Sequence, residues 1–183
     1  TNWRVYSMSR PWIQTLRAGF LLGSTIFNFI ALRYLQLAET AAIAFAAPFF
    51  IVGLAGPVLG EWAGPRRWAA ALIGFVGVVI IVEPGPSTFQ PAALLPLAAA
   101  CCYAGYNLTT RLLSGIESPA SMLLYPALFA TAILTPPLPF VGSLPPGWLV
   151  AGLMLVMGAA GGMGHWFLIV AHRGTPASLL APF

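Results

Sequence analysis

Long apolar stretches, separated by short polar or proline-rich breaks, dominate this chain of 183 residues. A helix needs about 20 apolar residues to cross about 30 Å of hydrocarbon. The breaks predict six such helices and the start of a seventh, over residues 16–37, 40–60, 68–82, 91–113, 118–135, 146–171 and from 175 onward. Apolar and polar residues do not alternate within these runs, and the runs are too long for the roughly ten-residue strands of a membrane barrel. The pattern therefore predicts an all-α, polytopic transmembrane helix bundle.

Composition supports a membrane protein and excludes several classes of site. Apolar residues make up 59% of the chain and charged residues only 7%, whereas soluble domains carry about 25% charged residues. The sequence contains no Lys, which excludes a Walker A phosphate loop, and no Asp, which excludes aspartyl catalysis. Two His and two Cys are too few for a conventional zinc site, so we expect neither metal nor cofactor. The scattered Arg residues form no basic stripe, which argues against a nucleic-acid partner.

The arginines also predict how the chain is oriented. If the segment before the first helix is cytoplasmic and the helices alternate, Arg33 alone lies outside. The inside then holds Arg4, Arg10, Arg17, Arg66, Arg67, Arg111 and Arg173. This distribution agrees with the excess of positive charge that cytoplasmic loops carry.

A weak internal match indicates a repeat. The apolar stretch 43–49 resembles 177–183, and five helices separate the two copies. An odd number of crossings makes the second copy inverted relative to the first. The chain lacks an initiator Met and stops within an apolar run, so we expect it to be a fragment.

Several short motifs, in order, resemble the EamA group of the drug/metabolite transporter (DMT) superfamily. They are ALRYLQLAETA (31–41), APF (47–49), LGE (59–61), RW (67–68), GFVGV (74–78), CYAGYNLTTR (102–111) and ASLLAPF (177–183). The resemblance implies a ten-helix fold of two inverted five-helix repeats with cytoplasmic termini. Residues 1–83 would be the C-terminal part of the first repeat, with three spans. Residues 91–183 would be a truncated second repeat, with three spans and the start of a fourth.

The same resemblance implies a function. Such proteins are secondary transporters, not enzymes, that move small metabolites or drugs across the cytoplasmic (inner) membrane. We expect amino-acid-like or amphipathic neutral substrates and efflux by alternating access. The expected partners are the lipid bilayer and a small-molecule substrate, while proton coupling and a homodimer are left open.

Polar groups within the predicted helices are candidates for a substrate cavity, because such groups are costly inside a bilayer. Ser24, Thr25 and Asn28 form a polar stripe, and His165 lies among glycines. The full set of cavity-lining candidates is Ser24, Thr25, Asn28, Tyr103, Tyr106, Asn107, His165 and Trp166. For these residues the alternative is structural: hydrogen bonds between helices, or tyrosines at the membrane interface.

Charged residues and one proline suggest structural or gating roles at the helix ends. Glu61 lies near Arg66 and Arg67 at the predicted cytoplasmic end, and Pro48 lies within the repeated motif. Glu83 and Glu117 are expected to be loop charges.

Two other classes of protein compete with a transporter. An intramembrane hydrolase could use Ser24 with His165, but the chain has neither a Gly-x-Ser-x-Gly elbow nor an Asp to orient the imidazole. A non-transporting membrane scaffold or subunit would have an interior without polar groups, which the Ser24–Thr25–Asn28 stripe argues against. A transporter of another family is the remaining alternative.

Overall fold

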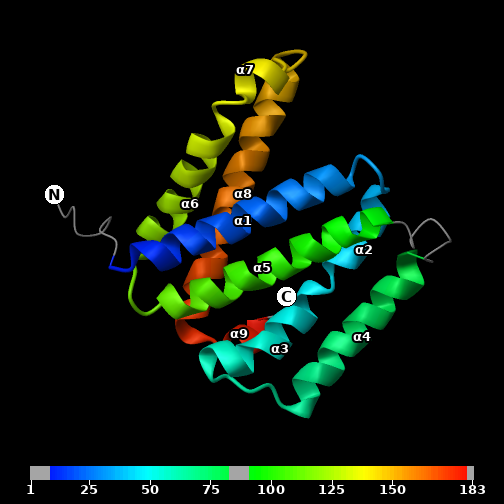
Figure 1. The fold of residues 1–183 in the computed structure, drawn as a ribbon, viewed down its shortest axis with the longest axis vertical. Helices are drawn as coiled ribbons and strands as arrows, with labels where there is room; N and C mark the ends of the chain where they lie inside the picture. Colours follow the sequence, from blue (N-terminus) through cyan, green and yellow to red (C-terminus); the bar gives the residue numbers. More distant parts are fainter. Residues whose placement is uncertain (1–8, 83–90, 181–183) are drawn as a thin grey trace.

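The computed structural model describes residues 9–82 and 91–180, and every regular element in these ranges is helical (Figure 1). The elements are α1 (Pro11–Ala31), α2 (Leu37–Ala44), α3 (Ala47–Leu59), α4 (Pro65–Val82), the short 3-10 helix η3 (Pro91–Ala93), α5 (Leu94–Leu113), α6 (Pro119–Leu134), α7 (Leu138–Val141), α8 (Trp148–Gly174) and α9 (Ala177–Leu180). The all-α class is therefore confirmed. Arg4, Glu83 and the last three residues of the internal match lie outside the described residues.

Local chemistry explains several helix ends. Pro11 and Pro119 stand in the first turns of α1 and α6, where a missing N–H costs nothing. The Ser118 hydroxyl accepts a hydrogen bond from the Ser121 N–H at 3.1 Å and so caps α6. Gly60 ends α3 with a φ of 73°, a conformation that glycine adopts readily.

Two of the expected helices have different boundaries. The first spans Pro11–Ala31 rather than 16–37, because a capping box between Gln36 and Glu39 starts α2 within the apolar run. The second is divided into α2 and α3 by a turn at residues 45–46. Pro48 has no N–H to donate to the Ala44 carbonyl, so the regular hydrogen-bond pattern is interrupted between α2 and α3.

Helices α1 and α5 lie side by side at the centre of the molecule (Figure 1). Their packing is completed by α6 and α8, which form an apolar cluster of Ile13, Leu113, Met122 and Ile169 with them. A second apolar cluster joins α3, α5 and α9. The α6–α7–α8 segment projects away from this centre in Figure 1.

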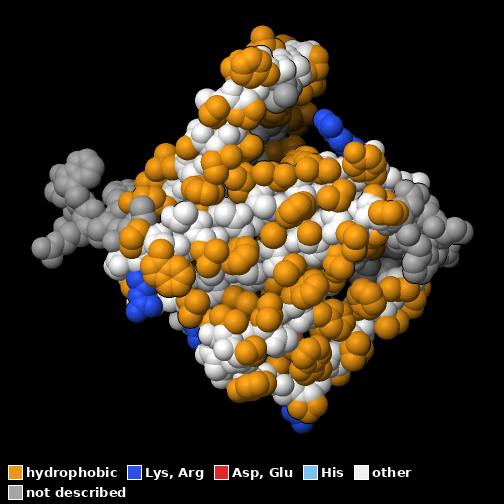
Figure 2. Space-filling view, viewed as in Figure 1, with side chains coloured by type: hydrophobic (Ala, Val, Ile, Leu, Met, Phe, Trp, Pro, Cys, Tyr) orange, Lys and Arg blue, Asp and Glu red, His pale blue; other side chains and the backbone are white. Residues whose placement is uncertain are grey.

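Hydrophobic side chains cover most of the face in Figure 2, and the few arginines lie near its edges. Among the described residues, three helical stretches are long and apolar enough to cross a membrane: Leu37–Leu59, Pro91–Leu113 and Trp148–Gly174. In the last of these, Trp148–Gly174, only 6% of the most apolar 18-residue segment is buried within the chain. An apolar helix that is exposed along most of its length suits lipid or another helix rather than water.

Candidate substrate pocket

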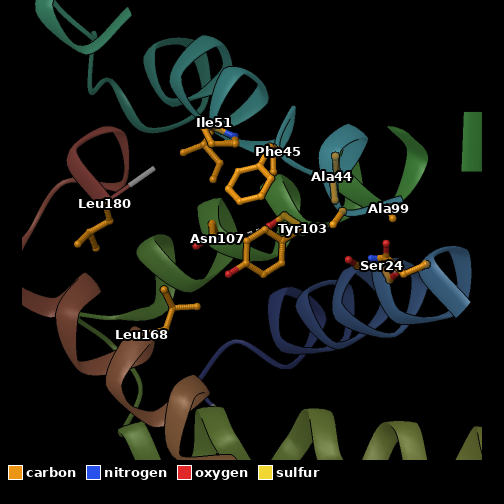
Figure 3. A pocket seen from close by; sticks show the side chains of 14 residues that line it. Ser24, Ala44, Phe45, Ile51, Ala99, Tyr103, Asn107, Leu168 and Leu180 are labelled. Atoms are coloured by element: carbon orange, nitrogen blue, oxygen red, sulfur yellow. Dashed lines mark hydrogen bonds between the residues drawn. The ribbon is translucent and has the colours of Figure 1, made fainter. Parts of the chain in front are cut away.

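A pocket of about 400 Å³ lies between α1, α2, α3, α5, α8 and α9 (Figure 3). Its volume falls within the roughly 300–1,000 Å³ typical of small-molecule sites. The polar lining residues are Ser24, Asn28, Tyr103 and Asn107, and the others are Ala41, Ala44, Phe45, Ala47, Pro48, Ile51, Ala99, Ala100, Leu168 and Leu180. None of the lining residues in the described part of the chain is charged. This wall suits a ligand with hydrogen-bonding groups and an apolar body.

The two asparagines are oriented in the same way. The Asn28 Nδ2 donates to the Ser24 carbonyl at 3.2 Å, and the Asn107 Nδ2 donates to the Tyr103 carbonyl at 2.8 Å. Because a carbonyl can only accept, each amide must turn its NH₂ group to its own helix. Each amide oxygen is then directed away from that bond, as an acceptor suited to a ligand.

Four of the eight residues predicted to line a cavity are brought together here, namely Ser24, Asn28, Tyr103 and Asn107. Thr25 is exposed on the other side of α1, and its hydroxyl donates to the Leu21 carbonyl at 3.0 Å. Trp166 is 39% exposed and is not among the lining residues.

Tyr106 and His165 lie beside the pocket rather than in its wall. The Tyr106 Oη is 3.1 Å from the His165 Nδ1, and the Tyr106 ring lies 6.0 Å from the ring of Tyr103, which lines the pocket. The imidazole thus contacts a tyrosine and not Ser24, the partner that an intramembrane hydrolase would require.

A fully buried arginine, which the sequence suggested only as an orienting charge, joins four helices. Arg17 on α1 donates from Nε to the Thr110 hydroxyl at 2.8 Å, from Nη1 to the Met122 carbonyl at 2.6 Å and from Nη2 to the Tyr106 Oη at 3.1 Å. Its guanidinium carbon also lies 4.7 Å from the centre of the Tyr106 ring, within range of a cation–π contact. Through Tyr106 the network reaches His165 on α8.

A second polar cluster joins the C-terminal ends of α3, α5 and α8 to the start of α9. The Arg111 Nε is 2.7 Å from the Glu61 Oε1, and the Arg111 Nη1 donates to the His172 carbonyl at 2.7 Å. The other Glu61 oxygen accepts the Ala177 N–H at 2.8 Å. We call Glu61, Arg111, His172 and Ala177 the end cluster.

The other residues assigned structural or gating roles lie in different places. Arg67 donates to the Ser178 hydroxyl of α9, next to the end cluster, whereas Arg66 is exposed. Pro48 lines the pocket in the first turn of α3.

Glu117, expected as a loop charge, is buried. Its Oε1 accepts the backbone N–H groups of Ser9 and Arg10 at 2.6 and 3.1 Å, just before α1 begins. No pattern in the sequence indicates this role, because the two segments are 107 residues or more apart.

Within the described part of the chain, no group of three His, Cys, Asp or Glu side chains is placed to hold a metal ion. The described pocket lining offers uncharged hydrogen-bonding and aromatic groups.

Comparison with known proteins finds a family and relatives that are all named as transporters. Residues 3–83 match the EamA-like transporter family. The riboflavin transporter of Rhizobium johnstonii is 32% identical over 145 residues, which cover 79% of this chain and 48% of that protein. The S-adenosylmethionine uptake transporter of Rickettsia prowazekii is 30% identical over 177 residues, which cover 96% of this chain and 59% of that protein. These relatives are named as transporters and not as enzymes.

The fold has a counterpart among solved structures. A protein crystal structure with 22% sequence identity superimposes with a TM-score of 0.79, over 99% of this chain and 64% of that one. The chain spans about half the length of the riboflavin transporter that it matches. The resemblance expected from the sequence is thus confirmed: residues 3–83 match the EamA-like transporter family, and the chain as a whole is similar to proteins named as transporters.

Proposed function

We propose that this chain forms the substrate-binding part of a secondary transporter for an uncharged, heteroaromatic small molecule. The observation that carries the proposal is the pocket of about 400 Å³, whose described wall offers amides, hydroxyls and aromatic rings but no charge. The relatives named as transporters make transport the natural use of such a pocket.

Among the substrates named for the relatives, the pocket lining favours riboflavin over S-adenosylmethionine. Riboflavin has a neutral flat ring with an N–H donor, and a chain of hydroxyl groups. The amide oxygens of Asn28 and Asn107 can accept from such donors, while Tyr103 and Phe45 offer ring faces or edges to the flavin. S-adenosylmethionine carries a sulfonium, an ammonium and a carboxylate, and burying charges without partners is costly. A riboflavin-like substrate is therefore the better match.

Both predicted repeats contribute to the pocket. Ser24, Asn28 and Pro48 come from residues 1–83, and Tyr103, Asn107 and Leu168 come from residues 91–183. A site between two inverted repeats suits alternating access, in which one repeat rocks against the other. In this proposal the chain lies in the cytoplasmic membrane, with the six spans and the five-plus-five helix arrangement expected from the sequence.

Two finer features complete the proposal. Proton coupling, if the transporter uses it, would act through His165, whose contact with Tyr106 connects it to the pocket wall. A homodimer would use the exposed apolar face of α8. The direction of transport, expected from the sequence to be efflux, is read from flux into and out of vesicles.

The test is flux of labelled riboflavin through the full-length gene product in proteoliposomes. Replacing Asn107 by Leu removes a hydrogen bond to the substrate, which is worth about 1–1.5 kcal/mol, so the KM should rise roughly tenfold. Thr25→Val removes a polar group from the exposed side of α1 and should leave the KM unchanged. Absence of riboflavin flux, or an unchanged KM in the Asn107→Leu variant, would refute the proposal.

A further inference from the structure

The end cluster lies one helical turn beyond the pocket on two helices. On α5, Asn107 lines the pocket and Arg111 pairs with Glu61. On α8, Leu168 lines the pocket and the His172 carbonyl accepts from Arg111. Residues four apart share one face of a helix, so the same faces of α5 and α8 carry the pocket and then the cluster.

Helix α9 connects the two sites directly. Its first residue, Ala177, donates its N–H to Glu61, and its last described residue, Leu180, lines the pocket. Between them the Ser178 hydroxyl accepts a hydrogen bond from Arg67 of α4. A displacement of α9 by a ligand at Leu180 would therefore act on the bonds at Ala177 and Ser178.

Apolar packing closes the space between the pocket and the end cluster. Ile51 belongs both to the pocket wall and to a buried cluster. That cluster consists of Ile51, Val52, Ala55, Ala104, Leu108 and Ala177. Toward the other end of the helices the pocket wall extends to Ala41 and Ala44 of α2. The described conformation is thus packed on the side of the end cluster.

We propose that the Glu61–Arg111 ion pair is the cytoplasmic gate of the pocket, with α9 as the element that links the gate to the bound substrate. The inference rests on the proposed transport function. The cytoplasmic assignment follows from the arginine distribution, which places Arg66, Arg67, Arg111 and Arg173 at this end.

The gate has the strength expected of a reversible contact. The side chains of Arg111 and Glu61 retain 25% and 18% of their exposure, so water can replace each partner when they separate. A fully buried pair would leave uncompensated charges on opening, at a cost of several kcal/mol. Glu61 holds α9 through the Ala177 N–H and Arg111 holds the His172 carbonyl of α8, so opening of the pair separates α3 and α9 from α5 and α8.

The experiment measures access to the pocket from the cytoplasmic side and needs no substrate. In the full-length protein every native cysteine, Cys101 and Cys102 among them, is replaced by Ser, and Leu168→Cys then places a single thiol in the pocket wall. Inside-out vesicles are treated with a membrane-impermeant maleimide. The variants are Arg111→Gln and Glu61→Gln, with Arg66→Gln as the control, because Arg66 is an exposed arginine near the same end.

We expect slow labelling without a gate substitution and with Arg66→Gln, and labelling roughly tenfold faster with Arg111→Gln or Glu61→Gln, which corresponds to a shift of ~1.4 kcal/mol toward the open state. The variants must elute as folded protein, and Glu61→Gln keeps the length of the side chain. Equal labelling in all variants, or rapid labelling of the parent, would overturn the gate. If riboflavin is not transported but labelling behaves as expected, the gate stands and the substrate proposal falls.

Discussion

Asn107 and Arg111 lie one turn apart on α5, and the first lines the pocket while the second pairs with Glu61 at 2.7 Å. A single helix face thus carries a residue suited to substrate recognition and a charge that fastens the neighbouring helices. Because a helix is stiff over one turn, a displacement of either residue also displaces the other. In the proposed mechanism, recognition and closure are therefore coupled through α5.

Filling the pocket should abolish transport without unfolding the protein. Ala100 lines the pocket, and Ala100→Phe would place a ring in the space that the substrate needs. We expect riboflavin flux to fall to background in proteoliposomes. Ala69→Phe adds the same ring at an exposed position of α4 and should leave flux intact. Normal flux with Ala100→Phe would place the substrate elsewhere.

Removing the buried arginine should destabilise the helix bundle. Arg17→Gln removes the hydrogen bonds to Thr110, Met122 and Tyr106, and a bond from a charged donor is worth about 1.5–3 kcal/mol. We expect a clear fall in the thermal unfolding midpoint in detergent. Arg17→Lys should rescue little of it, because an ammonium group cannot reproduce the guanidinium fork.

The control for Arg17 is the exposed Arg33, in the turn that follows α1. Arg33→Gln should leave the unfolding midpoint within experimental error. Equal midpoints for the Arg17 and Arg33 variants would mean that the network contributes nothing to stability.

His165 and Tyr106 should act as one unit. We expect His165→Ala and Tyr106→Phe each to reduce transport severalfold at unchanged membrane abundance, because each removes the hydrogen bond between these two side chains beside the pocket. A double-mutant cycle on kcat/KM should then show a coupling of at least about 0.5 kcal/mol. Unchanged flux in His165→Ala would remove His165 from the mechanism, and additive effects would show that the two side chains act separately.

A charge on the exposed face of α8 should impair membrane insertion. Val156 is 65% exposed near the middle of this apolar helix. Val156→Arg places a cation at a depth where insertion costs about 2.5–3.5 kcal/mol, so the abundance of inserted protein should fall. Leu144→Arg, in the exposed segment before α8, should be tolerated. Glycosylation mapping reports insertion, and equal insertion of both variants would contradict a lipid-facing α8.

The helical architecture was largely predictable, because the lengths of the apolar runs and the positions of the turn residues indicate where helices begin and end. The helix break before Pro48 was not, although the proline itself was the signal for it. The pattern of polar residues in α1 and α5 was sufficient to propose Ser24, Asn28, Tyr103 and Asn107 for one cavity. It could not separate them from Thr25 or Tyr106, because the faces of a helix are assigned only once its neighbours are known.

Arg17 and Glu117 were beyond sequence reasoning for a different reason. A charge near a predicted helix end normally lies at the membrane surface, and seven of the eight arginines fitted one side of the membrane. Burial of Arg17 depends on groups supplied by α5 and α6, 89 or more residues away. Burial of Glu117 likewise depends on the segment before α1. Long-range partners of this kind leave no periodic trace in a single sequence.

The most direct test of the pocket is equilibrium binding of riboflavin to the purified full-length protein, followed by quenching of flavin fluorescence. We expect saturable binding that is unaffected by Thr25→Val and weakened roughly a hundredfold when both Asn28 and Asn107 are replaced by Leu, at about 1.4 kcal/mol for each amide. No saturable binding, or equal affinity in the double variant, would contradict the claim that this pocket recognises the transported molecule.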